Sequence, residues 1–351
     1  MDRILVSGAT GTIGLPLVEE LKKSLRNVDI VCLYRSDPPP DLDVRWLRCD
    51  LTGDESVDRC VELLKGGGRC LGIHCAADVA WNKTLEEVTP VNIKGSLNFF
   101  DILKRTAADP RAIYLSSAYT SVSDWNYRNS YEESKAIAER EIKRRFPDIP
   151  ISVFSSSLVI GSTTTGEISR FHGIYPIIKF SALFDVPFFV GKKDCLVDLI
   201  PLDWTIEQLM AMVWRVAEGQ PCDDVVASGS KFRITLTELA QLIYRDINRY
   251  REQMGLQIKE IPPILSQRQW GFIRRSIETW DIKKLPPRKF KYFEGLMESY
   301  KHYISDDTVL PPKNLTSEAP DPRTYFQKVS DYWFKENKDY ISARWLRGIA
   351  K

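Results

Sequence analysis

Hydrophobic positions in the first half of the chain form short continuous runs, which alternate with stretches where they recur at helical spacing. Short apolar runs predict buried strands, and the helical spacing predicts amphipathic helices. The expected strands are residues 3–7, 29–34, 44–49, 71–75, 112–116 and 151–155. The expected helices are residues 12–25, 55–64, 90–106 and 129–146. Strands and helices that alternate over short connections predict the α/β class, with a doubly wound parallel sheet of the Rossmann type.

The pattern changes after about residue 157. Strands are expected at residues 196–201 and 224–228, with a helix over residues 204–217 between them. From residue 235 onward the chain reads as helices that are separated by proline pairs and are rich in Phe, Tyr and Trp. The expected domains are a Rossmann domain, residues 1–160 plus about 196–230, and a smaller, mainly helical substrate-binding lobe, about 161–195 and 231–351.

Charge and composition remove several classes of function. The chain has 351 residues, with 49 Lys and Arg against 47 Asp and Glu, which gives no electrostatic reason to expect nucleic acid as a partner. The 7 cysteines lack a CxxC pair and are expected to be reduced, and the 3 histidines are too scattered for a metal site. The sequence shows neither a signal peptide nor a membrane span, so a cytoplasmic location is expected. The oligomeric state is left open.

A glycine-rich loop follows the first expected strand. Glycines 8, 11 and 14 stand between that strand and the first helix, in the sequence GATGTIG. Gly8, Gly11 and Gly14 allow a tight turn and a close approach of the backbone to a pyrophosphate, while the helix N-terminus offers free N–H groups. The loop therefore predicts a dinucleotide cofactor.

Three further strand ends favour the same cofactor. Arg35 follows the second strand, where NAD-preferring folds carry an acidic residue, and an arginine there can pair with a 2′-phosphate. Asp50 and Leu51 follow the third strand, where a carboxylate can accept a hydrogen bond from the adenine amino group. The small residues Ala76 and Ala77 follow the fourth strand and leave room for the cofactor. The sequence thus favours NADP(H) over NAD(H).

The candidate catalytic residues follow the fifth strand. Tyr131 and Lys135 lie one turn apart on one face of an expected helix. A nearby ammonium is expected to lower the pKa of the tyrosine, which can then exchange a proton with a substrate oxygen during hydride transfer. Ser117, preferred over Ser116 because it begins the loop, can donate a hydrogen bond to a substrate carbonyl oxygen.

These motifs together resemble the extended short-chain dehydrogenase/reductase superfamily. The resemblance rests on GATGTIG at residues 8–14, on Ser116-Ser117-Ala118, and on YEESK at residues 131–135. Three segments are most similar to the thioester reductases, which include reductase domains of peptide synthetases, carboxylate reductases and fatty acyl-CoA reductases. These segments are HCAADVAW…VNIKGSLN at residues 74–98, GSTTTGE at 161–167 and LVDLIPLDW at 196–204. The chain departs from the superfamily at Ser155-Ser156, where Arg-Pro is usual.

The resemblance implies NADPH-dependent reduction of an acyl thioester, bound to a carrier protein or to coenzyme A, to an aldehyde or an alcohol. It implies a catalytic triad of Ser117, Tyr131 and Lys135. It also implies that the following residues surround the cofactor, together with Tyr131 and Lys135: Gly8, Thr10, Gly11, Thr12, Ile13, Gly14, Arg35, Asp50, Leu51, Ala76, Ala77 and Asn92.

Two other functions stay open. The first is an NADP-dependent dehydrogenase, ketoreductase or epimerase that acts on an alcohol, a sterol or a nucleotide sugar. Against a sugar nucleotide, the C-terminal part is rich in aromatic rather than in arginine and other polar residues, which favours a substrate with an apolar portion. The second is a nucleotide-sensing or scaffold protein without catalysis. Such a protein would be expected to have lost Tyr131 or Lys135, and both are present.

Overall fold

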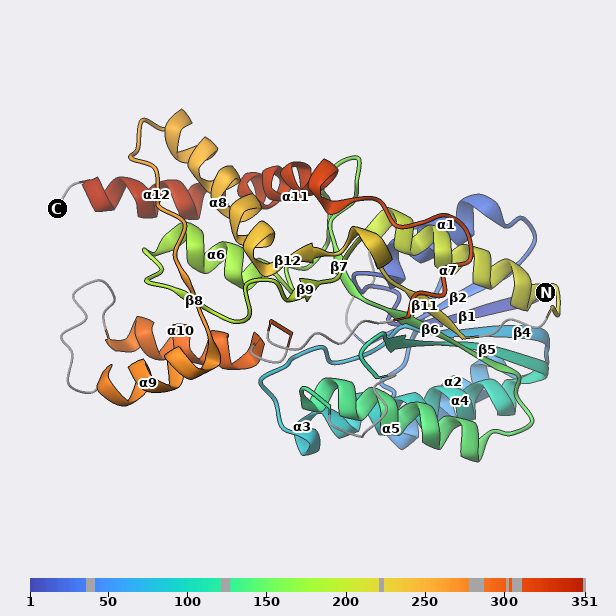
Figure 1. Cartoon of the computed structure of the whole chain (residues 1–351). Coiled ribbons are helices and arrows are strands. Elements are labelled where there is room, and N and C mark those ends of the chain that lie inside the picture. Colours follow the sequence, from blue (N-terminus) through green and yellow to red (C-terminus); the bar gives the residue numbers. More distant parts are fainter. Residues whose placement is uncertain are drawn as a thin grey trace. The chain divides into compact units, whose positions relative to one another are not determined.

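The computed structural model of the protein describes residues 1–35, 42–120, 127–220, 224–277, 287–300, 303–304 and 311–349. The chain forms two compact units, which are coloured along the sequence in Figure 1. The first unit contains Met1–Ser157, Thr205–Ser228 and Leu310–Glu318. The second unit contains Leu158–Trp204, Gly229–Val309 and Ala319–Lys351.

A parallel sheet of 7 strands forms the centre of the first unit, in the order β11-β6-β5-β4-β1-β2-β3. The strands are β1 (Arg3–Ser7), β2 (Asp29–Tyr34), β3 (Arg45–Arg48), β4 (Gly67–His74), β5 (Ala107–Ser117), β6 (Ile151–Ser156) and β11 (Val225–Ala227). The order reverses direction at β1, which is the mark of a doubly wound sheet, and ligands of such sheets bind at the carboxyl ends of the strands. The predicted α/β Rossmann fold is confirmed.

Helices cover both faces of this sheet (Figure 1). The helices α2 (Asp54–Leu64), α4 (Gly95–Thr106) and α5 (Ser130–Arg145) lie on one face. The helices α1 (Gly14–Ser24) and α7 (Leu202–Ala217) lie on the other. The connections between strands and helices are short, as the sequence predicts for a sheet of parallel strands.

The helix that the sequence predicts over residues 90–106 differs in one respect. It is preceded by α3 (Leu85–Thr89), which Thr84 caps, and the two are joined by a π-helical turn over Pro90–Lys94. Pro90 lacks a backbone N–H, so the regular ladder of hydrogen bonds cannot continue through it. The Gly95 N–H instead bonds back to the carbonyl of Pro90, across five residues. Such turns occur frequently at functional sites.

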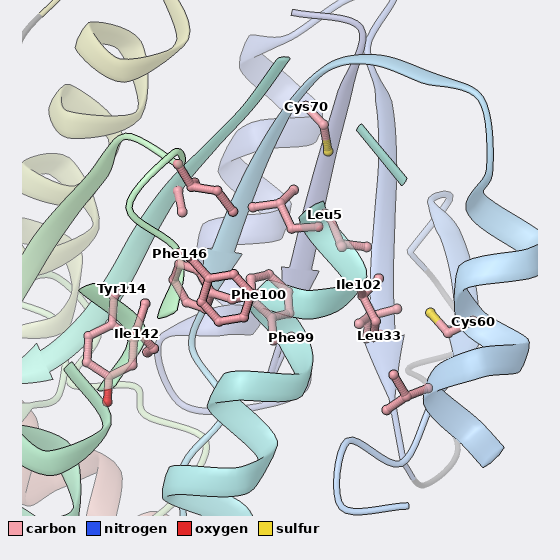
Figure 2. Close-up of a cluster of buried hydrophobic side chains, with 14 of the residues drawn as sticks. Leu5, Leu33, Cys60, Cys70, Phe99, Phe100, Ile102, Tyr114, Ile142 and Phe146 are labelled. Atoms are coloured by element: carbon pink, nitrogen blue, oxygen red, sulfur yellow. The ribbon is translucent and has the colours of Figure 1, made fainter. Parts of the chain in front are cut away.

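The core beneath the α2–α4–α5 face combines aliphatic side chains with a group of aromatic rings (Figure 2). Phe99 packs edge-on against Phe100, and Phe100 packs at a tilt against Phe146, with ring centroids 5.8 Å apart in both pairs. Gly72 on β4 lets α4 approach, since a Cβ there would lie only 2.7 Å from Leu103 Cδ2. This packing holds α4 and α5 against β4 and β5.

The second unit is mainly helical. Its helices are α6 (Tyr175–Leu183), α8 (Leu236–Gln253), α9 (Gln267–Ile277), α10 (Pro287–Tyr300), α11 (Pro322–Glu336) and α12 (Lys338–Ile349). Its short strands pair as β7 (Leu158–Ile160) with β10 (Leu199–Pro201), β9 (Leu196–Val197) with β12 (Ile234–Thr235), and β8 (Phe189–Val190) with β13 (Ile264–Leu265). None of the helices in the described ranges is both long and apolar enough to cross a membrane.

The division of the chain differs in detail from the expected domains. Residues 196–204, which the sequence assigns to the Rossmann domain, belong to the second unit, because β9 and β10 pair with strands of that unit. Leu310–Glu318 returns to the first unit. There Lys313 and Val226 exchange backbone hydrogen bonds at the edge of β11.

Candidate active site

The glycine loop forms a cradle that side chains would fill. Gly8 has a φ of +67°, and a Cβ on it would lie 2.5 Å from the backbone nitrogen of Ala76. The Gly11 N–H donates to the Gly8 carbonyl at 2.9 Å, and a Cβ on Gly14 would overlap that carbonyl. The helix α1 begins at Gly14 without an acidic residue in its first turn. The open backbone of the loop and the positive end of the α1 dipole suit a pyrophosphate, so the loop fits a dinucleotide cofactor.

The other expected loop residues are also placed at this edge. Thr10, Thr12 and Ile13 are partly exposed on the loop itself. Ala76 and Ala77 come one residue after the end of β4, which is adjacent to β1, and both remain partly exposed. Small side chains therefore line the ends of β1 and β4, as expected for a surface that a cofactor crosses.

Arg35 and Asp50 come together at the ends of β2 and β3. The Asp50 carboxylate accepts hydrogen bonds from the Thr52 N–H at 3.0 Å and from the Thr52 hydroxyl at 2.8 Å. The Thr52 hydrogen bonds lower the pKa of Asp50, and the positive charge of Arg35 lowers it further. Arg35 itself is exposed, and its charge also lowers the pKa of Asp78. The guanidinium of Arg35 thus stands at an exposed edge that carries two carboxylates.

Asn92 and Leu51 support this edge from within. Asn92, in the π-helical turn, is 0% exposed. Its amide oxygen accepts the N–H of Asp78 at 2.7 Å, and its amide nitrogen donates to the Asp78 carbonyl and to the Ser134 hydroxyl, at 3.0 and 2.8 Å. Asn92 therefore ties the segment after β4 to α5. Leu51 packs against the hydrophobic core of the unit.

Tyr131 and Lys135 stand in the first two turns of α5. The helix begins at Ser130, where the Asn129 side chain caps it by accepting the Glu132 N–H at 3.0 Å. Tyr131 is partly exposed, whereas Lys135 is only 2% exposed. Burial lowers the pKa of Lys135 to about 7. The two side chains thus occupy one end of α5, with the lysine beneath the surface.

The pKa of Tyr131 moves in the direction opposite to the sequence prediction. Burial raises it above its usual value, and the carboxylate of the neighbouring Glu132 adds to the effect. The ammonium of Lys135 lies over the ring of Tyr114, 4.1 Å from its centroid. In the protein alone, desolvation therefore outweighs the expected stabilisation of a phenolate, and Tyr131 is held in its protonated form.

Ser117 ends β5 and is 6% exposed. Its hydroxyl oxygen faces the Tyr119 N–H at 3.4 Å, and its carbonyl accepts the Thr120 hydroxyl at 2.7 Å. The hydroxyl of Ser116 is directed instead toward the Glu139 carboxylate, at 3.4 Å. The hydroxyl groups of Ser116 and Ser117 thus have different neighbours, and Ser117 is the last residue of β5 and not the first of the loop. Residues 121–126, between Ser117 and Tyr131, lie outside the described residues.

Comparison with known proteins gives a consistent picture. An NAD-binding family model, described as male sterility protein, matches residues 121–209. The fatty acyl-CoA reductase wat of Drosophila melanogaster is 25% identical over 97 residues, which are 27% of this chain and only 19% of that protein. The terminal R domain of the myxalamid PKS-NRPS biosynthetic pathway has a similar structure, with a TM-score of 0.63, 15% identity and coverage of 97% of this chain and 92% of that domain.

A second solved structure has a similar fold and contains a bound dinucleotide. The UDP-glucose 4-epimerase of Thermus thermophilus, in complex with NAD, has a TM-score of 0.54 and 16% identity over 78% of this chain and 93% of its own. The family model and the fatty acyl-CoA reductase each match only part of this chain, and the solved structures share its fold. The NAD-binding family model and the glycine cradle both support a nicotinamide dinucleotide as the cofactor.

The same unit also contains a buried chain of hydrogen-bonded polar side chains that the sequence analysis missed. His74, at the end of β4, bonds through Nδ1 to the Ser7 hydroxyl at 2.6 Å and through Nε2 to the Ser96 hydroxyl at 2.8 Å. Ser96 donates to the Asn92 carbonyl at 2.6 Å, so its oxygen accepts the Nε2–H of His74. Burial keeps the pKa of His74 well below its usual value, which makes the imidazole neutral. The signal in the sequence was a histidine and a serine at the matching ends of two apolar runs.

Proposed function

We propose that this protein is an NADPH-dependent reductase that converts an acyl thioester, bound to a carrier protein or to coenzyme A, to an aldehyde or an alcohol. The observation that carries the proposal is that Tyr131 and the buried Lys135 stand one turn apart on α5, in the same unit as the glycine cradle. The similarity to a fatty acyl-CoA reductase and to an R domain supports the choice of substrate.

The proposed chemistry divides among three side chains. When bound, reduced nicotinamide would supply the hydride for the carbonyl carbon. Tyr131, with its raised pKa, would donate a proton to the carbonyl oxygen, and Lys135 would hold positive charge next to that site. Ser117 would donate a hydrogen bond to the same oxygen as negative charge develops on it. Cleavage of the carbon–sulfur bond would then release the thiol and leave an aldehyde.

The choice of NADPH over NADH is part of the proposal. Its support is the exposed guanidinium of Arg35 at the end of β2, next to Asp50 and Asp78. A 2′-phosphate would give this guanidinium a partner with two negative charges, whereas the two carboxylates already have hydrogen bonds of their own.

The second unit is proposed to bind the apolar portion of the substrate. It contains stacked aromatic side chains, among them Phe180 and Phe293 with ring centroids 5.4 Å apart. We also propose that the protein works in the cytoplasm. Neither proposal requires a particular oligomeric state.

A second candidate is an NADP-dependent dehydrogenase, ketoreductase or epimerase. It is favoured by the shared fold of the UDP-glucose 4-epimerase. The same Tyr131 and Lys135 would serve that chemistry, in which the proton moves to or from an alcohol oxygen.

The deciding experiment compares substrates under one condition. The purified chain is incubated with NADPH and a series of acyl-CoA and acyl-carrier thioesters, and cofactor oxidation, aldehyde and free thiol are measured together. The proposal expects thioester-dependent oxidation of NADPH with release of one thiol for each aldehyde. Absence of turnover with every thioester, together with reduction of NADP+ by an alcohol, would establish the second candidate instead.

A further inference from the structure

A buried ammonium is costly unless a neighbouring group compensates for its lost hydration. Lys135 is 2% exposed, and its Nζ lies 4.1 Å from the centroid of the Tyr114 ring. An ammonium within about 6 Å of an aromatic face is attracted by the negative charge density of that face. The ring of Tyr114 is thus a direct partner of the Lys135 charge.

The ring of Tyr114 is also held firmly in place. Tyr114 is 0% exposed on β5, and its hydroxyl donates to the backbone carbonyl of Lys135 at 3.3 Å. The ring stacks on His74, its neighbour on β4, with centroids 5.8 Å apart and an interplanar angle of 10°. Figure 2 shows Tyr114 extending from the sheet into the core beneath the helices, with its hydroxyl at the far end. One side chain therefore contacts both the backbone and the charge of Lys135.

The titratable groups around Lys135 leave the ring as its main stabilising contact. His74, on β4, is neutral at physiological pH because burial lowers its pKa. Cys75, at the end of β4, is a neutral thiol because burial raises its pKa. Glu139, one turn along α5, attracts Lys135 but is already paired with Lys143 at 2.9 Å.

The phenol of Tyr131, on α5 itself, is protonated as well. Its neutral state matches those of His74 and Cys75, so these three groups bring no negative charge to the ammonium at neutral pH.

We propose that Tyr114 is a positioning residue for Lys135. The face of the Tyr114 ring holds the ammonium, and the Tyr114 hydroxyl fixes the turn of α5 from which the lysine side chain extends. The proposal deepens the proposed function, since it concerns the residue that is to hold charge next to Tyr131. It assigns to the ring the task of favouring the charged lysine against the cost of burial.

The sign of the effect follows from this assignment. An aromatic face favours the charged form, so removal of the ring lowers the pKa of Lys135 further below its present value of about 7. We expect a shift of about one pH unit, the size of a desolvated cation–π interaction. At neutral pH most of the lysine would then be uncharged.

The test titrates Lys135 directly, in the protein without substrate. Lysine labelled with carbon-13 at Cε is followed by NMR across the pH range, and the signal of Lys135 is assigned by its loss in Lys135→Met. Tyr114→Leu removes the ring and Tyr114→Phe keeps it. Phe99→Leu is the matched control, because Phe99 is equally buried and also contacts the ring of His74.

The expected result is a downward shift of about one unit in Tyr114→Leu, with little change in Tyr114→Phe and in Phe99→Leu. An unchanged titration in Tyr114→Leu overturns the proposal, and so does an equal shift in Tyr114→Phe. If Tyr114→Leu does not fold, a series of ring-fluorinated phenylalanines at position 114 keeps the shape and withdraws charge from the face. A stepwise decrease in the pKa of Lys135 along this series then supports the proposed contact between ring and ammonium. An unchanged pKa across the series excludes it.

Enzyme kinetics separate this proposal from the proposed function. If the charged lysine is required, the alkaline limb of the pH–rate profile moves to lower pH in Tyr114→Leu and stays in place in Phe99→Leu. If the NMR titration of Lys135 shifts in Tyr114→Leu but the protein does not turn over thioesters, the proposed role of Tyr114 stands and only the proposed function is rejected.

Discussion

The cradle at the start of α1 and the buried lysine at the start of α5 belong to the same unit but are built on opposite principles. The cradle consists of backbone whose shape depends on missing side chains, since a Cβ on Gly8 or Gly14 would strike neighbouring main-chain atoms. The lysine site consists of side chains, since the Tyr114 ring contacts both Lys135 and His74, and each of the three is at most 2% exposed.

The comparison shows that the two parts of the site should respond to different changes, the cradle to a change in shape and the lysine site to a change in protonation. Backbone N–H groups carry no titratable charge, so binding in the cradle depends on space and hardly on protonation over the neutral range. A buried ammonium depends on its protonation state, and its burial costs stability. Substitutions in the cradle should therefore impair binding alone, and substitutions in the lysine site should change pH dependence, turnover and stability.

The largest effect is expected for Tyr131→Phe, which removes one oxygen from the lysine site. Loss of the proton donor should reduce turnover by about 10³-fold, within the usual range for general acid catalysis. NADPH affinity, measured by the quenching of protein fluorescence, should stay within about twofold, because the cradle is untouched. Retained turnover would remove Tyr131 from its proposed role.

Gly14→Ala should have the reverse profile. The new Cβ would overlap the carbonyl of Gly8, and the loop must shift to accommodate it. We expect NADPH to bind about 100-fold more weakly, which corresponds to the upper range of overpacking costs. Gly53→Ala is the matched control, because its Cβ would meet no atom closer than 3.9 Å. Equal NADPH affinity in the two variants would contradict the steric account of the cradle.

The same contrast explains what the sequence could predict. The sequence could single out Gly8, Gly11 and Gly14 because glycine is the residue type that tight turns and close backbone contacts require. It could place Tyr131 and Lys135 on one helix face because their spacing is one helical turn. The alternation of apolar runs was sufficient for the parallel sheet.

Interactions between distant segments were not visible in this way. Strand register and burial bring Lys135 into contact with Tyr114 and give His74 its partners. Local sequence patterns do not specify either of them. For that reason the sequence predicted a lowered pKa for Tyr131, while burial raises it. The return of Leu310–Glu318 to the first unit was missed for the same reason.

Lys135→Met should make the protein more stable and inactive. The pKa of Lys135 in the folded protein, about 7, lies below its usual value of 10.5, so the unfolded chain binds the proton more tightly. The cost to stability is therefore full at and below neutral pH and shrinks as the pH rises toward the usual value.

We expect the free energy of unfolding to increase by roughly 2 kcal/mol at neutral pH, measured by urea denaturation. The gain should fall at alkaline pH. Lys23→Met, at a side chain that is 72% exposed, should leave stability nearly unchanged. A stability gain that does not vary with pH would show that Lys135 is not the buried charge described here.

Arg35→Ala tests whether the cofactor edge depends on any side-chain charge at all. The cradle is shared by both cofactors, whereas the guanidinium would contact only the 2′-phosphate of NADPH. NADPH affinity should fall about tenfold, as for the loss of one exposed charge-assisted contact, and NADH affinity should change less than about twofold. The control is Arg48→Ala, which removes an exposed arginine on the neighbouring strand β3. In the unaltered protein, added salt should reduce the difference between NADPH affinity and NADH affinity. Equal losses of affinity for NADPH and NADH would contradict the role of Arg35. They would mean that the backbone and the shape of the site determine cofactor binding at the ends of β2 and β3, as they do in the glycine cradle.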